Sequence, residues 1–198
     1  MSSDNNEYNK MVDKRLAEDS PEVFGNFSYE NAKYIIPRFV SNAEESVSIF
    51  AGSIPGDFYG KSLGPEGIPF YEAIEKAVQN IVAKRQQMKN VAESSIRIIT
   101  IDDKKNPDLV QFAEATNKKY GVSVIKIIQA EYQGKEKLKH YLVVDHKRYR
   151  LEEAHESFRN GPPEILKAEV CCNNPDKATL MENSFNRIWS VLSDKKNK

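Results

Sequence analysis

Three short runs rich in valine and isoleucine, separated by segments of helical periodicity, constrain the fold of this chain most strongly. The runs lie at residues 46–52, 96–101 and 122–128, and the helical segments lie at 70–88 and 107–119. Near-continuous apolar strands are typical of a sheet that is buried on both faces, and strand–helix–strand units form right-handed crossovers between parallel strands. The alternation therefore predicts an α/β domain whose first three strands run parallel.

The order of elements changes after the third run. Residues 139–144 and 148–152 flank a tight turn and predict a hairpin, residues 165–172 predict another strand, and Asn174-Pro175 opens a final helix. A hairpin joins antiparallel strands, so we expect a mixed β-sheet flanked by helices.

The beginning of the chain is polar and charged. Met11, Val12 and Leu16 would form one face of a short helix, so this segment is either flexible or docks as a helix. We predict a flexible or docking N-terminal arm over residues 1–27 and a single α/β domain over residues 28–198.

Charge and hydropathy exclude some classes of partner. The chain carries 29 basic and 29 acidic residues, so no global field attracts nucleic acid or an anionic membrane, and a local patch would have to hold either one. The longest apolar runs are strand-length, far below the roughly 20 residues that span a bilayer. The polar N-terminus also lacks the hydrophobic stretch of a signal peptide. These features predict a cytoplasmic protein with no membrane partner.

The cysteines and histidines predict neither a metal nor a cofactor. Cys171 and Cys172 are the only two cysteines, and neighbouring strand side chains point to opposite faces, which disfavours a disulfide between them. We expect both to be reduced packing residues, because no further cysteine completes a site. A metal site built on His155 and Glu152 would lack the spacing of a known zinc motif.

Residues 138–152 hold two of the three histidines and surround the predicted turn. This segment resembles the strand-turn-strand of phospholipase D-like proteins, in which the motif HxKxxxxD occurs. The order of elements and the ending Asn173-Asn174-Pro175 followed by 185–189 strengthen the resemblance, which covers about residues 28–193. It implies one phospholipase D-type half.

The resemblance also implies a chemistry. In active family members the histidine attacks a phosphodiester, the lysine binds the phosphoryl oxygens, and the histidine of a second copy protonates the leaving group. Single-motif members work as homodimers, because two half-sites must meet across a two-fold axis. A homodimer is thus implied here.

The motif departs from the family pattern in either register. Aligning Asp145 with the family aspartate puts Leu138 at the nucleophile position and His140 at the lysine position. Making His140 the nucleophile puts Leu142 at the lysine position and Lys147 at the aspartate position. Because neither register restores the triad, we expect a catalytically inactive domain that acts as a binding or regulatory module.

The candidate ligand-binding residues are His140, Lys147, Arg148 and Arg150, which would hold a nucleic acid or a phosphorylated ligand, whereas a protein partner would be met by the N-terminal arm. Basic and aromatic residues on a hairpin can clamp a phosphate backbone while a ring stacks on a base. Glutamates follow directly, however, so a solvated face of mixed charge is the alternative.

The competing hypothesis is a phosphodiesterase or nuclease with a rearranged site that uses His140, Asp145 and His155 as catalytic residues. Two structural roles stand against it. His140 could instead be satisfied by a polar group in the core or at an interface, and an aspartate at a hairpin turn commonly bonds its own backbone.

Overall fold

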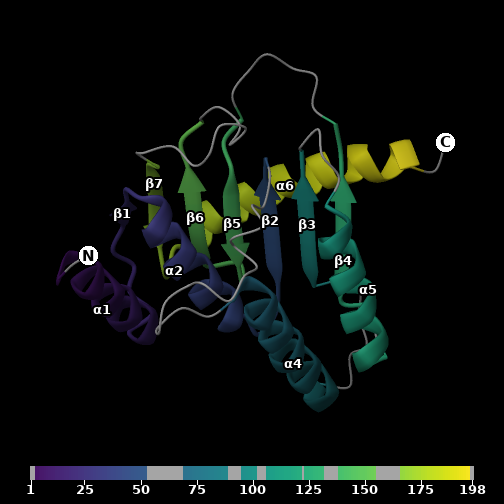
Figure 1. Ribbon diagram of the computed structural model, residues 1–198, viewed down its shortest axis with the longest axis horizontal. Coiled ribbons are helices and arrows are strands. Elements are labelled where there is room, and N and C mark those ends of the chain that lie inside the picture. Colours follow the sequence, from purple (N-terminus) through teal and green to yellow (C-terminus); the bar gives the residue numbers. More distant parts are fainter. Residues whose placement is uncertain are drawn as a thin grey trace.

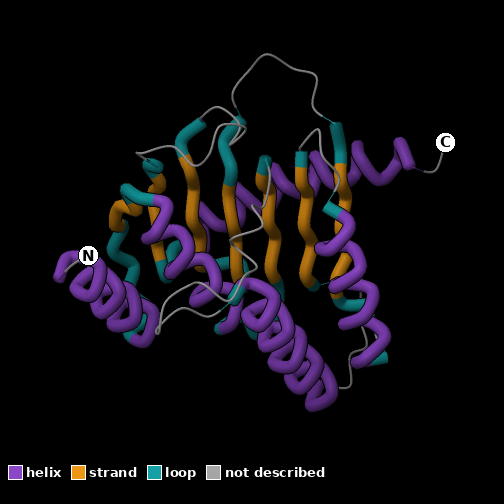
Figure 2. Tube along the Cα trace, in the orientation of Figure 1, coloured by secondary structure: helices purple, strands orange, loops and turns teal. Residues whose placement is uncertain are grey.

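The computed structural model describes residues 3–52, 69–88, 95–101, 106–121, 123–131, 138–154 and 166–196. Within these ranges the chain forms one seven-stranded mixed sheet with helices on both faces (Figures 1 and 2). The predicted α/β class with a mixed, helix-flanked sheet is confirmed. In chain order the elements are α1 (Ser3–Ala17), β1 (Phe24–Asn26), α2 (Tyr29–Ser41), β2 (Val47–Ala51), α4 (Phe70–Met88), β3 (Ile96–Thr100), α5 (Pro107–Tyr120), β4 (Ile125–Gln129), β5 (Tyr141–Val144), β6 (Arg148–Glu152), β7 (Ala168–Cys171) and α6 (Pro175–Lys196).

The strand order is β1-β7-β6-β5-β2-β3-β4. Strands β2, β3 and β4 are parallel, as the apolar runs predict, and β5 lies antiparallel to β2. The remaining pairs are antiparallel. One end of the sheet therefore carries the carboxyl ends of β2, β3 and β4 together with the start of β5.

Two apolar layers cover the sheet. Side chains such as Ile49 and Leu142 face α2 and α4, whereas Phe50 and Val143 face α6, as the alternation of strand side chains requires. Helix α6, yellow in Figure 1, crosses the face opposite to the other helices. A buried side chain of this size contributes about 1.5–3 kcal/mol, so the two layers account for much of the stability.

Local signals explain where α5 ends and β4 begins. Gly121 adopts φ 66° and caps α5, a left-handed conformation that glycine reaches without steric cost. The backbone N–H groups of Val124 and Ile125, which follow the cap, donate hydrogen bonds to the Asn117 side chain of α5. The strand starts at Ile125 rather than at the predicted residue 122.

The first 27 residues contribute a helix and a strand. Val12 of α1 is fully buried in the core, and the Tyr34 hydroxyl of α2 donates to Asp13 of α1 over 2.7 Å. Strand β1 pairs with β7 and adds an edge to the sheet that the sequence pattern does not reveal. The division into an arm and a domain at residue 27 stays a prediction.

Candidate functional site

The turn between β5 and β6 is built around Asp145. Asp145 and His146 have φ values of 51° and 55°, the left-handed pair typical of the hairpin turn that matches strand twist. The Asp145 carboxylate accepts from the backbone N–H groups of Glu44, Glu45 and Ser46 over 2.8–3.1 Å. It also pairs with Arg148 at 3.1 Å. Asp145 thus joins the hairpin to the segment that leads into β2.

His140 lies at the other end of β5. Five residues of a strand span about 17 Å, so the structure does not bring His140 and Asp145 together. Leu138 lies outside the strand and packs against the cluster of Phe50 and Phe185 on the α6 face. The third catalytic candidate, His155, lies outside the described residues.

The partner of His140 is Glu152. Its Nδ1 lies 3.3 Å from Glu152 Oε1, and the second oxygen of Glu152 accepts from Arg150. The Arg150 Nε in turn donates to Asn26 over 2.8 Å. We call these four residues, His140, Glu152, Arg150 and Asn26, the His140 network.

The network is buried on the face that packs against α1 and α2. Arg150 is 3% exposed, Glu152 5% and Asn26 not at all. Arg150 and Glu152 share this face because they are two residues apart in β6. A buried guanidinium is tolerated only when a carboxylate and further hydrogen bonds compensate its lost hydration, and Glu152 and Asn26 provide them.

The other ring nitrogen of His140 faces the main chain of β2. A Cβ built on Gly52 would lie 2.9 Å from His140 Nε2, so the glycine permits this close approach. With Glu152 accepting from Nδ1–H, Nε2 is the nitrogen that would attack or accept a proton. Access to Nε2, which lies beside Gly52, therefore determines whether the imidazole can act as a base or a nucleophile.

The predicted basic residues separate into two groups. Arg150 belongs to the His140 network, whereas Lys147 and Arg148 lie at the turn, near Asp145. Lys147 Nζ pairs with Asp19 over 2.6 Å, and Arg148 lies 3.6 Å from the same carboxylate. The structure thus gives each of these cations a carboxylate partner and does not gather them with His140.

Tyr149 points away from these cations. It is fully buried against α6, and its hydroxyl donates to Glu169. Burial first, and then this hydrogen bond, raise the pKa of Tyr149, while Lys177 and Tyr149 together lower the pKa of Glu169. The ring is therefore a core residue and does not stack on a ligand.

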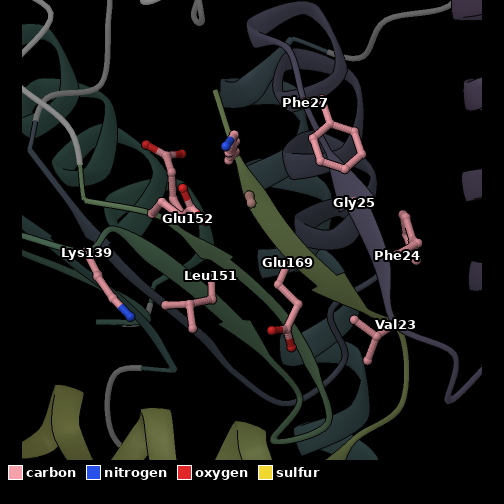
Figure 3. Close-up of a pocket in the computed structure, with 11 residues that line it drawn as sticks. Val23, Phe24, Gly25, Phe27, Lys139, Leu151, Glu152 and Glu169 are labelled. Atoms are coloured by element: carbon pink, nitrogen blue, oxygen red, sulfur yellow. The ribbon is translucent and has the colours of Figure 1, made fainter. Parts of the chain in front are cut away.

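A groove of about 410 Å³ opens on the α6 side of β1, β6 and β7, where side chains of both charges meet an exposed ring (Figure 3). Leu151 lies between Lys139 and Glu169 in this view, and Phe27 lies beside Gly25. The Phe27 ring occupies the place that a side chain at Gly25 would take. The groove is lined by Val23, Phe24, Gly25, Phe27, Lys139, Leu151, Glu152, Glu153, Lys167, Ala168 and Glu169.

The sequence pattern does not reveal this groove. Backbone hydrogen bonds from Glu152 to His140 and from Glu153 to Lys167, 2.8 Å each, continue the ladders beyond the strands. They bring Lys139, Glu153 and Lys167 side by side on one face. The alternation of strand side chains predicts the face of the sheet to which each residue points. The pairing of β7 with β6 and β1 cannot be predicted from the sequence.

The described ranges hold neither a metal cluster nor a membrane-spanning helix. No group of three or more His, Cys, Asp or Glu side chains in that part of the chain is arranged to hold a metal. The helices of the same ranges also lack the length and apolar content of a membrane span.

The architecture is that of the phospholipase D-type fold, so the predicted resemblance is confirmed for the fold. One similar structure is Nuc from Salmonella typhimurium, a phospholipase D family member, with 13% identity over 86% of this chain and 95% of that chain at a TM-score of 0.54. Another is TrmBL2, an archaeal chromatin protein with a novel mode of DNA binding, with 11% identity over 96% of this chain and 61% of that chain at a TM-score of 0.54. NucT from Helicobacter pylori is 15% identical over 85% of this chain and 97% of that chain, with a TM-score of 0.48. No protein-family model and no curated protein sequence matches this chain.

Proposed function

We propose that this chain is a catalytically inactive phospholipase D-type module that binds single-stranded nucleic acid. The proposal of inactivity rests mainly on one observation, the burial of His140, whose side chain is only 14% exposed and whose Nε2 lies close to Gly52. A nucleophile must reach the phosphorus atom from an open site. The groove on the α6 side of the sheet is lined by Lys139 and Glu152 but not by His140.

The charges of the network support the same proposal. Cleavage of a phosphodiester needs cations on the phosphoryl oxygens. The cation nearest to His140 within the network is Arg150, and its guanidinium is buried and bonded to Glu152 and Asn26. The network then serves the fold, because it compensates a buried charge.

The groove supplies the elements of a binding site. Lys139 and Lys167 are exposed beside it, and Phe27 offers a ring that is 63% exposed. Lysines bind phosphates and an exposed ring stacks on any base. Glu169 is paired with Lys177, which leaves Glu153 as the carboxylate that opposes a phosphate. DNA binding by TrmBL2, which shares the fold, supports the same ligand class.

The binding test uses fluorescence anisotropy with labelled single- and double-stranded DNA at several salt concentrations. We expect the single strand to bind more tightly, and the variant Lys139→Glu/Lys167→Glu to lose most of the affinity. The slope of log K against log salt should fall by roughly 1–2, because about two phosphate contacts are removed.

The matched control is Lys76→Glu/Lys118→Glu, which makes the same charge change at exposed positions on α4 and α5. It should keep the wild-type affinity for the single strand. Equal losses in both variants would show that only net charge matters and would refute the groove as the binding site.

The second candidate function is a phosphodiesterase or nuclease, and the contact between His140 Nδ1 and Glu152 favours it. A carboxylate on Nδ1 orients an imidazole and makes Nε2 a better base or nucleophile. The assay is cleavage of labelled DNA, RNA and a generic phosphodiester. Activity that His140→Ala abolishes and His146→Ala retains would overturn the inactive module, since His146 lies exposed at the turn.

A further inference from the structure

The two edges of the sheet differ in how they are protected. The edge strand β4 carries Lys126, an exposed charge near its centre, which is a common means of preventing strands from pairing with other chains. The β1 edge, residues 23–28, contains no charged residue. It exposes Val23 by 53% and Phe27 by 63%. An exposed apolar edge without a charged residue is suited to pairing with a strand of another chain.

The pattern of β1 is symmetric about Gly25. Val23, Gly25 and Phe27 alternate onto the face of α6, whereas Phe24 and Asn26 point to the opposite face and are buried. The two exposed apolar residues thus flank the glycine at equal distances along the strand. A strand with this symmetry complements itself when it is turned around.

We propose that β1 pairs with β1 of a second copy of this chain, antiparallel and centred on Gly25. In this register Val23 lies opposite Phe27 of the partner subunit, and the same contact repeats across the two-fold axis. Directly opposed side chains in antiparallel strands have Cβ atoms about 4.5–5.5 Å apart, so each exposed ring covers an exposed valine. The two sheets join into one.

A second copy fits this edge better than an unrelated strand for two reasons. The self-complementary pattern fills both apolar positions at once, and the formal net charge of zero removes the long-range repulsion that otherwise separates identical proteins. The interface is a single short strand pair, smaller than the roughly 1,600 Å² of a standard stable complex. We therefore expect a dimer that dissociates on dilution.

This dimer would cover Phe27, the ring that the proposed function assigns to base stacking, so the oligomeric state is measured without nucleic acid. It also differs from the dimer in which two half-sites meet. His140 precedes β5, and β7 and β6 separate β5 from the β1 edge. An edge-to-edge dimer thus keeps the two copies of His140 apart. A cross-linking experiment distinguishes the two arrangements.

The first test introduces Val23→Cys and Phe27→Cys together and oxidises the protein. The proposed register puts each new thiol opposite one of the partner, so the double variant should form a covalent dimer that a reductant reverses. The single variants should stay uncrosslinked, because equivalent residues lie about 13 Å apart along the strands, beyond the reach of a disulfide. The native Cys171 and Cys172 are buried and do not interfere.

The second test is analytical ultracentrifugation of the unmodified protein over a range of concentrations. Val23→Glu/Phe27→Glu should sediment as a monomer with unchanged stability, since both positions are exposed. The control Leu180→Glu/Val191→Glu makes the same change at the exposed apolar positions of α6 and should dimerise like the wild type. A monomeric wild type at every concentration, a dimer lost only in the control, or cross-linking through Lys139→Cys with none through residues 23 and 27 would each overturn the proposal.

Discussion

Replacing Asp145 tests whether this residue of the motif serves the fold or the chemistry. Asp145→Ala removes the acceptor of three backbone N–H groups at residues 44–46 and the partner of Arg148. Its side chain is only 8% exposed, so water replaces these bonds poorly. We expect a large loss of stability and no direct effect on a ligand at the distant groove.

The magnitude follows from the contacts. A hydrogen bond to a charged group contributes about 1.5–3 kcal/mol, and breaking a buried ion pair costs about 3–5 kcal/mol. These terms overlap because they share one carboxylate, so we expect about 3–5 kcal/mol for Asp145→Ala. Asp145→Asn keeps one oxygen and the tolerance for a positive φ, and should cost roughly 1–3 kcal/mol. Since a domain is stable by about 5–15 kcal/mol, the alanine variant approaches unfolding.

The assay is urea unfolding followed by the fluorescence of Trp189, the single tryptophan. The control is Asp194→Ala, an exposed aspartate near the end of α6, which should change the free energy of unfolding by less than about 0.5 kcal/mol. An Asp145→Ala variant with wild-type stability but without ligand binding or cleavage would refute the structural role and support a functional one.

Three further outcomes are expected. His146→Gly should raise the free energy of unfolding by about 0.5–1 kcal/mol in urea, because His146 has φ 55° and glycine relieves that strain. Burial raises the pKa of Tyr34 and Tyr71 to about 12, above the ordinary value near 10, so the stability they contribute is complete below pH 10 and is lost as the pH rises towards 12. The urea midpoint of unfolding, measured at pH values from 9 to 12, should decrease over that range. It should decrease less steeply in the variant Tyr34→Phe. Burial also raises the pKa of the Cys172 thiol to about 11, so neither Cys172 nor the buried Cys171 should react with a thiol reagent at pH 8 until the protein unfolds.

The fold follows from the sequence wherever a local pattern determines an element. The apolar runs indicate β2, β3 and β4, and the tight turn indicates the β5–β6 hairpin. Strand β1 has no such signal, because three residues are too few to show a period. Its place depends on the pairing of Phe24 with Val170, a contact between distant parts of the chain.

The contact between His140 and Glu152 could be predicted from the sequence. The turn fixes the pairing of Val144 with Arg148, and counting back along both strands puts His140 opposite Glu152. Alternation likewise places Arg150 beside Glu152 and turns Tyr149 away. Asn26 was not predictable in this way, since it reaches Arg150 only through the pairing of β1 with β7.

The separation of His140 and Asp145 bears on how a strand motif is interpreted. Residues five apart in a strand lie at opposite ends and on opposite faces, so closeness in sequence does not make them a catalytic pair. The imidazole takes its carboxylate partner from the neighbouring strand, at Glu152, while Asp145 supports the backbone at the other end. The two ends of the segment thus make separate contacts: Leu138 packs on the α6 face, whereas Asp145 accepts from the backbone at residues 44–46. The bonds of Asp145 are consequently evidence for the fold and carry no information about catalysis.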